Sequence, residues 1–159
     1  MQTTSEQTAK LHFSAFDGRQ IFWQHQIPEK PRANILLVHG FGEHSSRYDE
    51  LALGLLERKF AVFRFDLRGH GRSDGKRGHI FNFDEYLKDF SSFKHQCLSH
   101  PRAANKSILM GHSYGGLIAT SVITRDPSDF SALVLSSPFF GLADGVPKWK
   151  VSLGKVLSA

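Results

Sequence analysis

The sequence lacks the features that mark secreted and membrane-spanning proteins. Cys97 is its only cysteine, which excludes an intrachain disulfide. No stretch approaches the roughly 18 apolar residues of a transmembrane helix. The opening MQTTSEQTAK has no apolar core of a secretory signal. These absences predict a cytoplasmic protein and leave open contact with a membrane surface.

Signals for a bound cofactor are missing as well. Residues 71–77, GRSDGKR, are one residue short of a Walker A loop and have no serine or threonine after the lysine. Gly40 and Gly42 are followed by Ser45, where a dinucleotide fingerprint requires glycine. Nearby polar residues match no zinc-binding helix motif: His39, Glu43, His44, His70 and His79. We therefore expect neither a cofactor nor a metal ion.

The composition is that of one globular domain with a mildly basic charge. The 159 residues contain no repeat or linker, and 40% hydrophobic against 22% charged residues is typical of a folded chain. The net charge is +5 at pH 7, and the densest basic stretch, 64–77, is interrupted by Asp66 and Asp74. That pattern indicates a solvated loop. We expect no nucleic-acid partner, whereas an anionic membrane surface is compatible with this charge.

Apolar patterns alternate regularly along the chain. Residues 11–27 predict a β-hairpin around Asp17-Gly18. Continuous apolar runs predict two buried strands, at 33–40 and 60–69, and two further strands are expected at 106–113 and 130–140. Helical spacing of apolar residues predicts helices over 47–59, over 84–99 and after residue 113. This order predicts an α/β fold, with a mostly parallel sheet, an N-terminal hairpin and helices on both faces.

Ligands of such sheets bind at the carboxyl ends of the strands. The chemistry should therefore lie in four segments, His39–Gly42, Asp66–Gly71, Gly111–Gly115 and Ser136–Phe139. Gly111-His112-Ser113-Tyr114-Gly115 has the G-x-S-x-G pattern at a strand-to-helix turn. Small residues two before and two after the serine leave room for a strained turn that lifts the hydroxyl above the sheet. A glycine-rich turn with an incidental serine is the alternative reading.

The turn after the first buried strand, His39-Gly40-Phe41-Gly42, is a candidate oxyanion hole. Acyl transfer requires two backbone N–H groups aimed at the developing oxyanion. We expect one from Tyr114, directly after Ser113, and the other from Phe41. An ordinary turn is the alternative, and the oxyanion hypothesis depends on Ser113.

Three segments together resemble the α/β-hydrolase fold and, more narrowly, its monoacylglycerol lipase and lysophospholipase branch. They are HGFGEHSSRY, DLRGHGRSDG and GHSYGG, in this order and spacing. The resemblance implies a serine hydrolase that cleaves carboxylic esters of lipid-like substrates through an acyl-enzyme. It implies Ser113 as nucleophile and the N–H groups of Phe41 and Tyr114 as the oxyanion hole. The other implied residues are substrate contacts at His39, Gly40, Gly42 and His112, and a structural loop with Asp66 and His70.

The sequence departs from this family in having no histidine after His112. In this fold the triad runs serine, then aspartate or glutamate, then histidine along the chain. Three carboxylates follow Ser113, but none stands where the family places the acid: Asp126, Asp129 and Asp144. A serine without an adjacent base is a weak nucleophile, so we expect this chain alone to be nearly inactive.

The resemblance also implies a boundary near residue 141. We expect residues 1–141 to be the N-terminal part of the hydrolase core, truncated after its sixth strand. Residues 142–159 would begin a cap or lid, with an amphipathic helix predicted by Trp149, Leu153, Val156 and Leu157. The strand at 130–140 would then expose an apolar edge. That edge is open to a complementing C-terminal segment or to self-association.

Several other functions remain open at this point. The chain could be a truncated, non-enzymatic module that binds acyl lipids or a protein. It could be an enzyme with an improvised base, His39 or His70. A peptidase-type α/β-hydrolase is a further alternative, whereas a haloalkane dehalogenase would have aspartate in place of Ser113. The lipid-ester hydrolase remains the favoured hypothesis, with a lipid ester as substrate.

Overall fold

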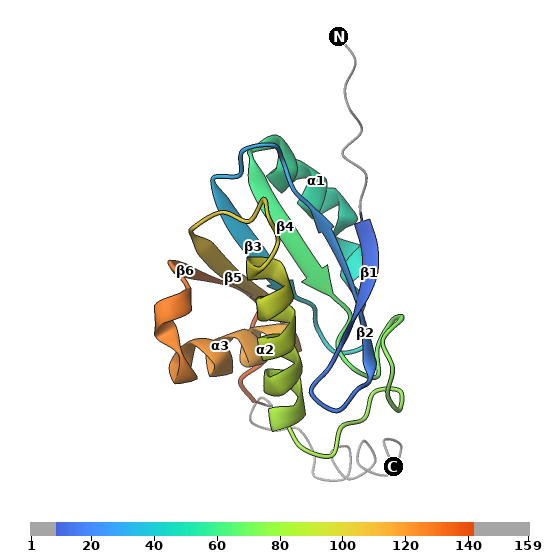
Figure 1. The fold of residues 1–159 in the computed structure, drawn as a ribbon. Helices are drawn as coiled ribbons and strands as arrows, with labels where there is room; N and C mark the ends of the chain where they lie inside the picture. Colours follow the sequence, from blue (N-terminus) through green and yellow to red (C-terminus); the bar gives the residue numbers. More distant parts are fainter. Residues whose placement is uncertain (1–8, 142–159) are drawn as a thin grey trace.

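The computed structural model describes residues 9–141 of the chain (Figure 1). The predicted cap segment, 142–159, and its amphipathic helix lie outside the described residues. The boundary at residue 141 therefore stays a prediction. Within 9–141 no helix is long and apolar enough to cross a membrane.

The strands of the described residues form one sheet, in the order β1-β2-β4-β3-β5-β6. They are β1 (Ala9–Ser14), β2 (Gln20–Gln26), β3 (Ala33–Val38), β4 (Phe60–Phe65), β5 (Ser107–His112) and β6 (Ala132–Ser136). β1 and β2 form the predicted hairpin, and β2 pairs antiparallel with β4. β4, β3, β5 and β6 run parallel, so their carboxyl ends share one edge of the sheet (Figure 1).

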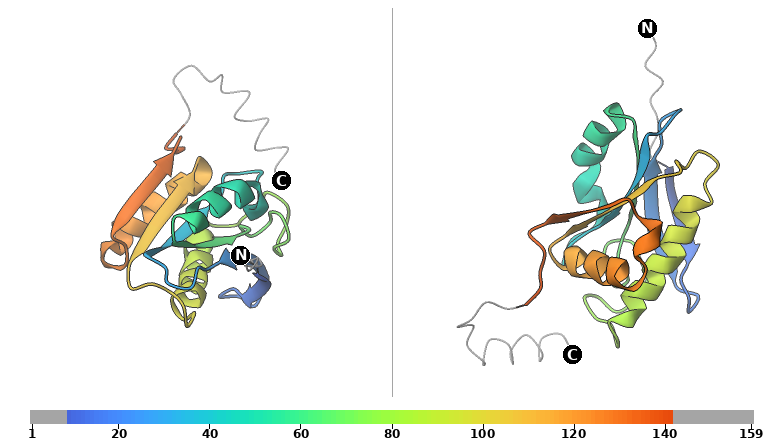
Figure 2. Two further views of the ribbon diagram at one scale, coloured as in Figure 1. Left: turned by 90° about the horizontal axis from the view of Figure 1, so that it is seen from above. Right: turned by 90° about the vertical axis from the view of Figure 1, so that its left-hand side faces the viewer.

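Helices cover both faces of this sheet, as predicted. They are η1 (Ser45–Tyr48), α1 (Asp49–Glu57), α2 (Asp84–Leu98), α3 (Tyr114–Arg125) and η2 (Pro127–Asp129), where η marks a short 3-10 helix. α1 lies against one face, and α2 and α3 lie side by side against the other (Figure 2). The predicted α/β-hydrolase fold class, an α/β sheet that is mostly parallel, is confirmed.

Several elements are shorter than the apolar pattern predicted. The strand expected over 60–69 ends at Phe65, because the chain turns from residue 66 onward. The strand expected over 130–140 ends at Ser136, because Ser137 takes a left-handed φ of 44°. The helix expected over 47–59 begins as a 3-10 turn, and Lys59 with φ 65° follows its end. Apolar runs thus continue past the last ladder hydrogen bond into the following loops, which are buried after β4 and mostly exposed after β6.

The larger part of the core lies between the sheet and α2. Every residue of β3 is buried, as the continuous apolar run predicted. On α2, the rings of Phe90 and Phe93 pack against Phe65 of β4, with centroids 6.4 and 4.4 Å apart. Trp23 of β2 meets Phe93 edge-on, and Cys97 is fully buried on the same helix. This packing fixes α2, and with it the end of the loop that precedes it.

Candidate functional site

Ser113 occupies a sharp turn between β5 and α3. Its φ of 50° and ψ of −117° lie in a region that residues other than glycine rarely adopt. A Cβ on Gly111 would lie 2.5 Å from the Gly115 carbonyl oxygen, and one on Gly115 would lie 2.3 Å from the Val38 carbonyl oxygen. Both glycines are therefore required by close backbone approach. This is the geometry that the G-x-S-x-G pattern predicts.

The backbone of Ser113 is held by the loop after β6. The Ser113 N–H donates to the Ser136 carbonyl oxygen at 3.0 Å, and the Phe139 N–H donates to the Ser113 carbonyl oxygen at 2.9 Å. These bonds place residues 136–139 beside the serine, as the sheet topology predicted. The strained turn is thus stabilised from two strands at once.

A cleft of about 370 Å³ opens beside Ser113. Three aromatic side chains line it with the serine, those of Phe41, Tyr114 and Phe139. The ring of Tyr114 lies 6.1 Å from that of Phe41 and 6.4 Å from that of Phe139, centroid to centroid. The cleft therefore offers apolar walls around one nucleophilic hydroxyl.

The turn that follows β3 approaches Ser113 closely. A Cβ on Gly40 would lie 3.2 Å from Ser113 Cβ, so a larger residue would crowd the nucleophile. Among the hydrogen bonds of residues 9–141, none uses the N–H of Phe41 or of Tyr114. The Tyr114 N–H is also the first of α3, at the positive end of the helix dipole. Two donors are thus available beside the serine.

Glu43 holds this turn in place, a role that sequence reasoning did not assign although the residue belongs to HGFGEHSSRY. Its Oε2 accepts hydrogen bonds from the Gly40 N–H at 3.0 Å and from the Tyr48 hydroxyl at 2.7 Å. Burial opposes ionisation, but these two hydrogen bonds keep the pKa of Glu43 below its usual value. Glu43 is therefore a carboxylate whose partners are a backbone N–H and a tyrosine hydroxyl. Gly42, the last residue of the turn, has a left-handed φ of 74°.

His39 lies beneath the turn and not at its surface. It is fully buried, its Nε2 accepts the Leu67 N–H at 2.9 Å, and its Nδ1 lies 2.7 Å from the Gly40 carbonyl oxygen. Nδ1 therefore carries the proton. Burial lowers the pKa of His39 to about 4. This placement corrects the expectation that the His39 side chain contacts substrate, and it removes His39 as an improvised base.

His70 and His112 occupy different surroundings. His70 is buried, its Nδ1 lies 3.1 Å from the Arg68 carbonyl oxygen, and its ring meets that of Phe41 edge to face with centroids 5.2 Å apart. The half-buried His112 has its Nδ1 3.1 Å from Ser136 Oγ. Within residues 9–141 no histidine nitrogen hydrogen-bonds the Ser113 hydroxyl.

Asp66 ties the loop after β4 to the start of η1. Its Oδ1 accepts the Ser45 N–H at 2.6 Å, and its Oδ2 accepts the Arg72 N–H at 2.8 Å. A Cβ on Gly71 would lie 2.0 Å from Asp66 Oδ2, so only glycine fits there. The carboxylate is buried and wholly occupied by backbone donors. Asp66 is thus placed as a structural residue.

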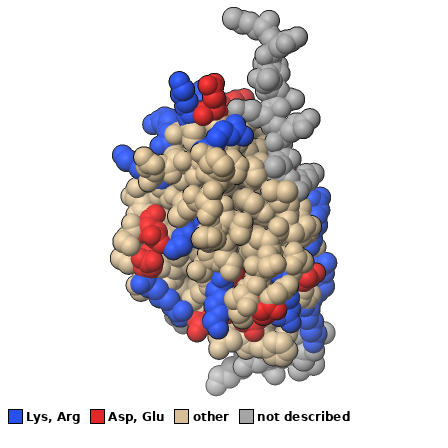
Figure 3. Space-filling model, in the orientation of Figure 1, with Lys and Arg blue, Asp and Glu red and all other residues tan. Residues whose placement is uncertain are grey.

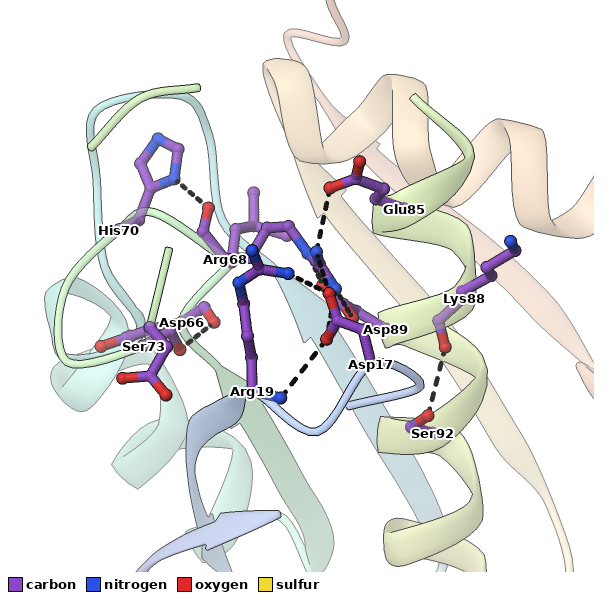
Figure 4. A network of polar contacts seen from close by, with 12 residues as sticks. Asp17, Arg19, Asp66, Arg68, His70, Ser73, Glu85, Lys88, Asp89 and Ser92 are labelled. Atoms are coloured by element: carbon purple, nitrogen blue, oxygen red, sulfur yellow. Dashed lines mark hydrogen bonds and ion pairs between the residues drawn. The ribbon is translucent and has the colours of Figure 1, made fainter. Parts of the chain in front are cut away.

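Arg68, also missed from the sequence, anchors the same loop (Figure 4). Its buried guanidinium contacts carboxylates from two other elements: Asp17 of the hairpin turn at 2.9 Å, and Glu85 and Asp89 of α2 at 2.9 and 2.6 Å. The motif DLRGHG contains Arg68, but nothing local in the sequence indicates partners 51 and 21 residues away. In residues 9–141 no group of three or more histidine, cysteine or carboxylate side chains could hold a metal ion.

Comparison with known proteins agrees with this geometry. A family model described as serine aminopeptidase, S33, matches residues 29–159. The monoacylglycerol lipase of Mycolicibacterium smegmatis is 36% identical over 147 residues, which are 91% of this chain and 52% of that protein. The monoglyceride lipase of Homo sapiens is 34% identical over 155 residues, which are 92% of this chain and 49% of that protein.

A solved structure shares the fold and much of the sequence. The monoacylglycerol lipase of Paleococcus ferrophilus is 35% identical and superposes with a TM-score of 0.71, covering 86% of this chain and 50% of that one. The chain spans about half the length of the relatives it matches.

Proposed function

The chain belongs to the hydrolase family described as serine aminopeptidase, S33, and on this premise we propose that Ser113 is the nucleophile of a lipid-ester hydrolase. One observation carries the proposal: a serine with φ 50° between a parallel strand and a helix, in one cleft with Phe41 and Tyr114. A serine in this conformation has no structural benefit, because glycine would adopt the same turn without backbone strain.

In the proposed reaction, Ser113 Oγ attacks the ester carbonyl carbon, and the carbonyl electron pair moves to the oxygen. The N–H groups of Phe41 and Tyr114 donate hydrogen bonds to that oxyanion. Collapse of the intermediate expels the alcohol, which leaves with the proton that Ser113 lost. Water then hydrolyses the acyl ester on Oγ, releases the fatty acid and restores the serine.

Proton transfer in both steps requires a base and an acid, which we place outside residues 9–141. We propose that they come from a segment that pairs with the free edge of β6. Among the described residues β6 is the last strand of the sheet, and no strand pairs with its outer edge. Val134 and Leu135 of β6 are 44% and 36% exposed, as an unfilled strand position would leave them. Either a complementing C-terminal segment or a second copy of the chain fits this edge. Without it, we expect at most roughly 10³–10⁴-fold acceleration over water.

The cleft and the relatives support one substrate class. Aromatic walls suit an acyl chain, and proteins named monoacylglycerol lipase match this chain at 36% and 35% identity. We therefore propose monoacylglycerols or lysophospholipids as substrates. We place the protein in the cytoplasm, at the surface of a membrane that contains them.

A peptidase is the second candidate, because the matching family is described by an aminopeptidase activity. The same nucleophile and oxyanion hole would serve an amide. Whether the protein is an esterase or a peptidase then depends on the leaving group, alcohol or amine, and on which substrate fits the cleft. A module that binds acyl lipids without cleaving them would keep the cleft but form no covalent intermediate.

Covalent trapping distinguishes these functions. The protein is incubated with the p-nitrophenyl ester of octanoic acid or with an aminoacyl p-nitroanilide, and the acyl adduct is measured by intact mass. We expect an octanoyl adduct that is lost in Ser113→Ala and retained in Ser91→Ala, a control at an exposed position of α2. Faster acylation by the anilide would favour the peptidase. No adduct in a folded sample would favour the binding module.

A further inference from the structure

Both peptide groups of the proposed oxyanion hole have a carbonyl oxygen that accepts hydrogen bonds. The Phe41 N–H belongs to the peptide group that carries the Gly40 carbonyl. The Tyr114 N–H belongs to the one that carries the Ser113 carbonyl. Residues 9–141 contain no cis peptide bond, and in a trans peptide the C=O and the N–H point in opposite directions. A donor that fixes the carbonyl oxygen therefore also fixes the direction of the N–H.

The Ser113 carbonyl is fixed by backbone groups. Its oxygen accepts the N–H groups of Phe139 and Gly116, both at 2.9 Å. Gly116 lies in the first turn of α3, and Phe139 lies in the loop after β6. The helix and this loop therefore orient the Tyr114 N–H without help from a side chain.

The Gly40 carbonyl depends on a side chain instead. His39 Nδ1 lies 2.7 Å from its oxygen, whereas the Glu43 N–H reaches the same oxygen only at 3.3 Å. An N–H···O hydrogen bond is best formed near 2.9 Å, so the contact with Glu43 is the weaker one. The orientation of the Gly40–Phe41 peptide group is therefore set mainly by His39.

The imidazole of His39 is itself held in one tautomer. Its Nε2 accepts the Leu67 N–H at 2.9 Å, so the proton of the neutral ring lies on Nδ1 and points at the Gly40 carbonyl oxygen. Lys and Arg side chains are interspersed with Asp and Glu over the surface drawn in Figure 3, whereas His39 is fully buried. The ring is thus fixed from within the fold, by two backbone groups that lie on either side of it in the sequence.

We propose that His39 is a positioning residue that aims the Phe41 N–H at the oxyanion formed on the substrate carbonyl. This role rests on the proposed function, because it requires that Ser113 attacks an ester. The Nδ1–H group holds the Gly40 carbonyl oxygen, and the N–H of the same peptide group is thereby directed to the opposite side, into the cleft. A carbonyl that accepts a hydrogen bond also makes the N–H of its peptide group a stronger donor. The buried ring acts on the reaction without touching the substrate.

Asparagine and glutamine in place of His39 separate this role from support of the loop after β4. Asparagine has a donor near the position of Nδ1 and can hold the Gly40 carbonyl oxygen, but it does not reach the Leu67 N–H. Glutamine has an acceptor near the position of Nε2 and can receive the Leu67 N–H, but it leaves the Gly40 carbonyl oxygen without its donor. Both variants should lose stability, and we expect only His39→Gln to lose the aim of the Phe41 N–H.

Acylation by an ester and by its thiono analogue measures the oxyanion hole. The thiono sulfur accepts hydrogen bonds poorly, so only the oxygen ester gains from a well-aimed N–H. The p-nitrophenyl ester of octanoic acid is compared with its thiono analogue by intact mass. We expect His39→Gln to slow the oxygen ester on the order of tenfold or more, short of the roughly 10²–10³-fold cost of a whole oxyanion donor, and to leave the thiono ester nearly unchanged. His39→Asn should react with both esters at close to the unmodified rates.

His25→Gln is the matched control. His25 is also a buried histidine, but it lies on β2, and its ring contacts Phe63 and His100 instead of the turn after β3. Its replacement should lower stability and leave the ratio of the two acylation rates unchanged. A ratio that falls equally in His25→Gln and His39→Gln would assign the effect to lost stability and overturn the proposal.

The amide signal of Phe41 gives a readout without turnover, in protein whose phenylalanines carry an isotope-labelled nitrogen. The chemical shift of an amide nitrogen responds to hydrogen bonding at the carbonyl of its own peptide group, and the signal is identified as the one lost in Phe41→Leu. Both His39 variants lose the ring, so the difference between them reports the hydrogen bond. We expect the signal of His39→Asn to lie closer to that of the unmodified protein than the signal of His39→Gln.

The two readouts distinguish failure of this role from failure of the proposed function. If esters acylate Ser113 but His39→Gln reacts as fast as His39→Asn, or faster, the positioning role alone fails. Phe41 signals that coincide in the two variants would also overturn it. If the signals differ as expected but no ester acylates Ser113 in the folded, unmodified protein, the proposed function fails, and the orientation of the Gly40–Phe41 peptide group by His39 stands.

Discussion

The position of Ser113 depends on two glycines at which backbone atoms meet. A Cβ on Gly115 would lie 2.3 Å from the Val38 carbonyl oxygen and 2.4 Å from that of His39, and neither backbone atom can move without shifting β3. The serine itself adopts a conformation that is costly for a residue with a side chain. The local sequence thus gives up stability to expose one hydroxyl at the end of β5.

Gly115→Ala should destabilise the protein by about 3 kcal/mol or more, because the methyl group overpacks against backbone. The matched control is Gly54→Ala on α1, where the nearest atom to an added Cβ is 3.7 Å away. That change should be neutral or stabilise by up to about 1 kcal/mol, because alanine favours a helix. Urea unfolding measures both. Equal effects at the two glycines would contradict the crowding at the elbow.

Single residues also show what the sequence could and could not reveal. Ser113 and the glycines around it follow from a local motif, because strain and crowding act within a few residues. The burial of His39 depends on the Leu67 N–H, 28 residues later, and no local pattern indicates it. The roles of Glu43 and Arg68 were missed for the same reason. The site was therefore predictable where its chemistry is local, and unpredictable where tertiary contacts assign the role.

At the scale of elements, the Arg68 network joins the β1–β2 turn, the loop after β4 and α2. Arg68 meets three carboxylates, and the Asp89 side chain among them is fully buried. Burial raises the pKa of Asp89, and the hydrogen bonds from Arg68 oppose that shift. The pair thus holds the loop that carries Asp66 and His70 against the start of α2.

Arg68→Met should cost about 3–5 kcal/mol, since it leaves the Asp89 carboxylate buried without its partner. The double variant Arg68→Met/Asp89→Leu removes that unpaired charge and should regain a large part of the loss. A double-mutant cycle by urea unfolding gives the coupling between the two residues. Additive effects would show that the network contributes little beyond packing.

Element boundaries were the least predictable part of the fold. The order of strands and helices followed from apolar periodicity, since β3 and β4 are buried almost throughout and the exposed edge strand β6 is an apolar run as well. The strand ends did not follow from it, because the loops after β4 and β6 contain apolar residues as well. Leu67 is fully buried outside β4, and Pro138 follows a left-handed Ser137 beyond β6. These strands end where the ladder of backbone hydrogen bonds stops, and the apolar pattern of the sequence does not indicate that point.

The whole molecule should lose stability as the pH falls below neutrality, owing to buried neutral histidines. Burial lowers the pKa of His25 from 6.5 to about 4, and the nearby charges of His100 and Arg102 add to the shift. Between pH 4 and pH 6.5 the His25 side chain binds a proton in the unfolded chain but not in the folded chain. The free energy of unfolding therefore rises with pH across this range. His39 acts in the same direction.

Acidification from pH 7.5 to 4 should therefore cost about 3 kcal/mol through His25 alone. Urea unfolding at a series of pH values measures it, and His25→Gln should flatten the curve by the equivalent of one proton. A curve that is flat between pH 6.5 and 4 in the unmodified protein would contradict the buried neutral state. A curve unchanged in His25→Gln would assign the effect to His39 or His70.

The central claim is that this fold builds a nucleophile at Ser113 and takes its base from elsewhere. Fluorophosphonate labelling followed by intact mass tests it, with imidazole added as a small base in place of the missing side chain. We predict one slow adduct that imidazole accelerates and that Ser113→Ala abolishes. Labelling that survives in Ser113→Ala, or a folded protein that remains unlabelled with imidazole present, would contradict the claim.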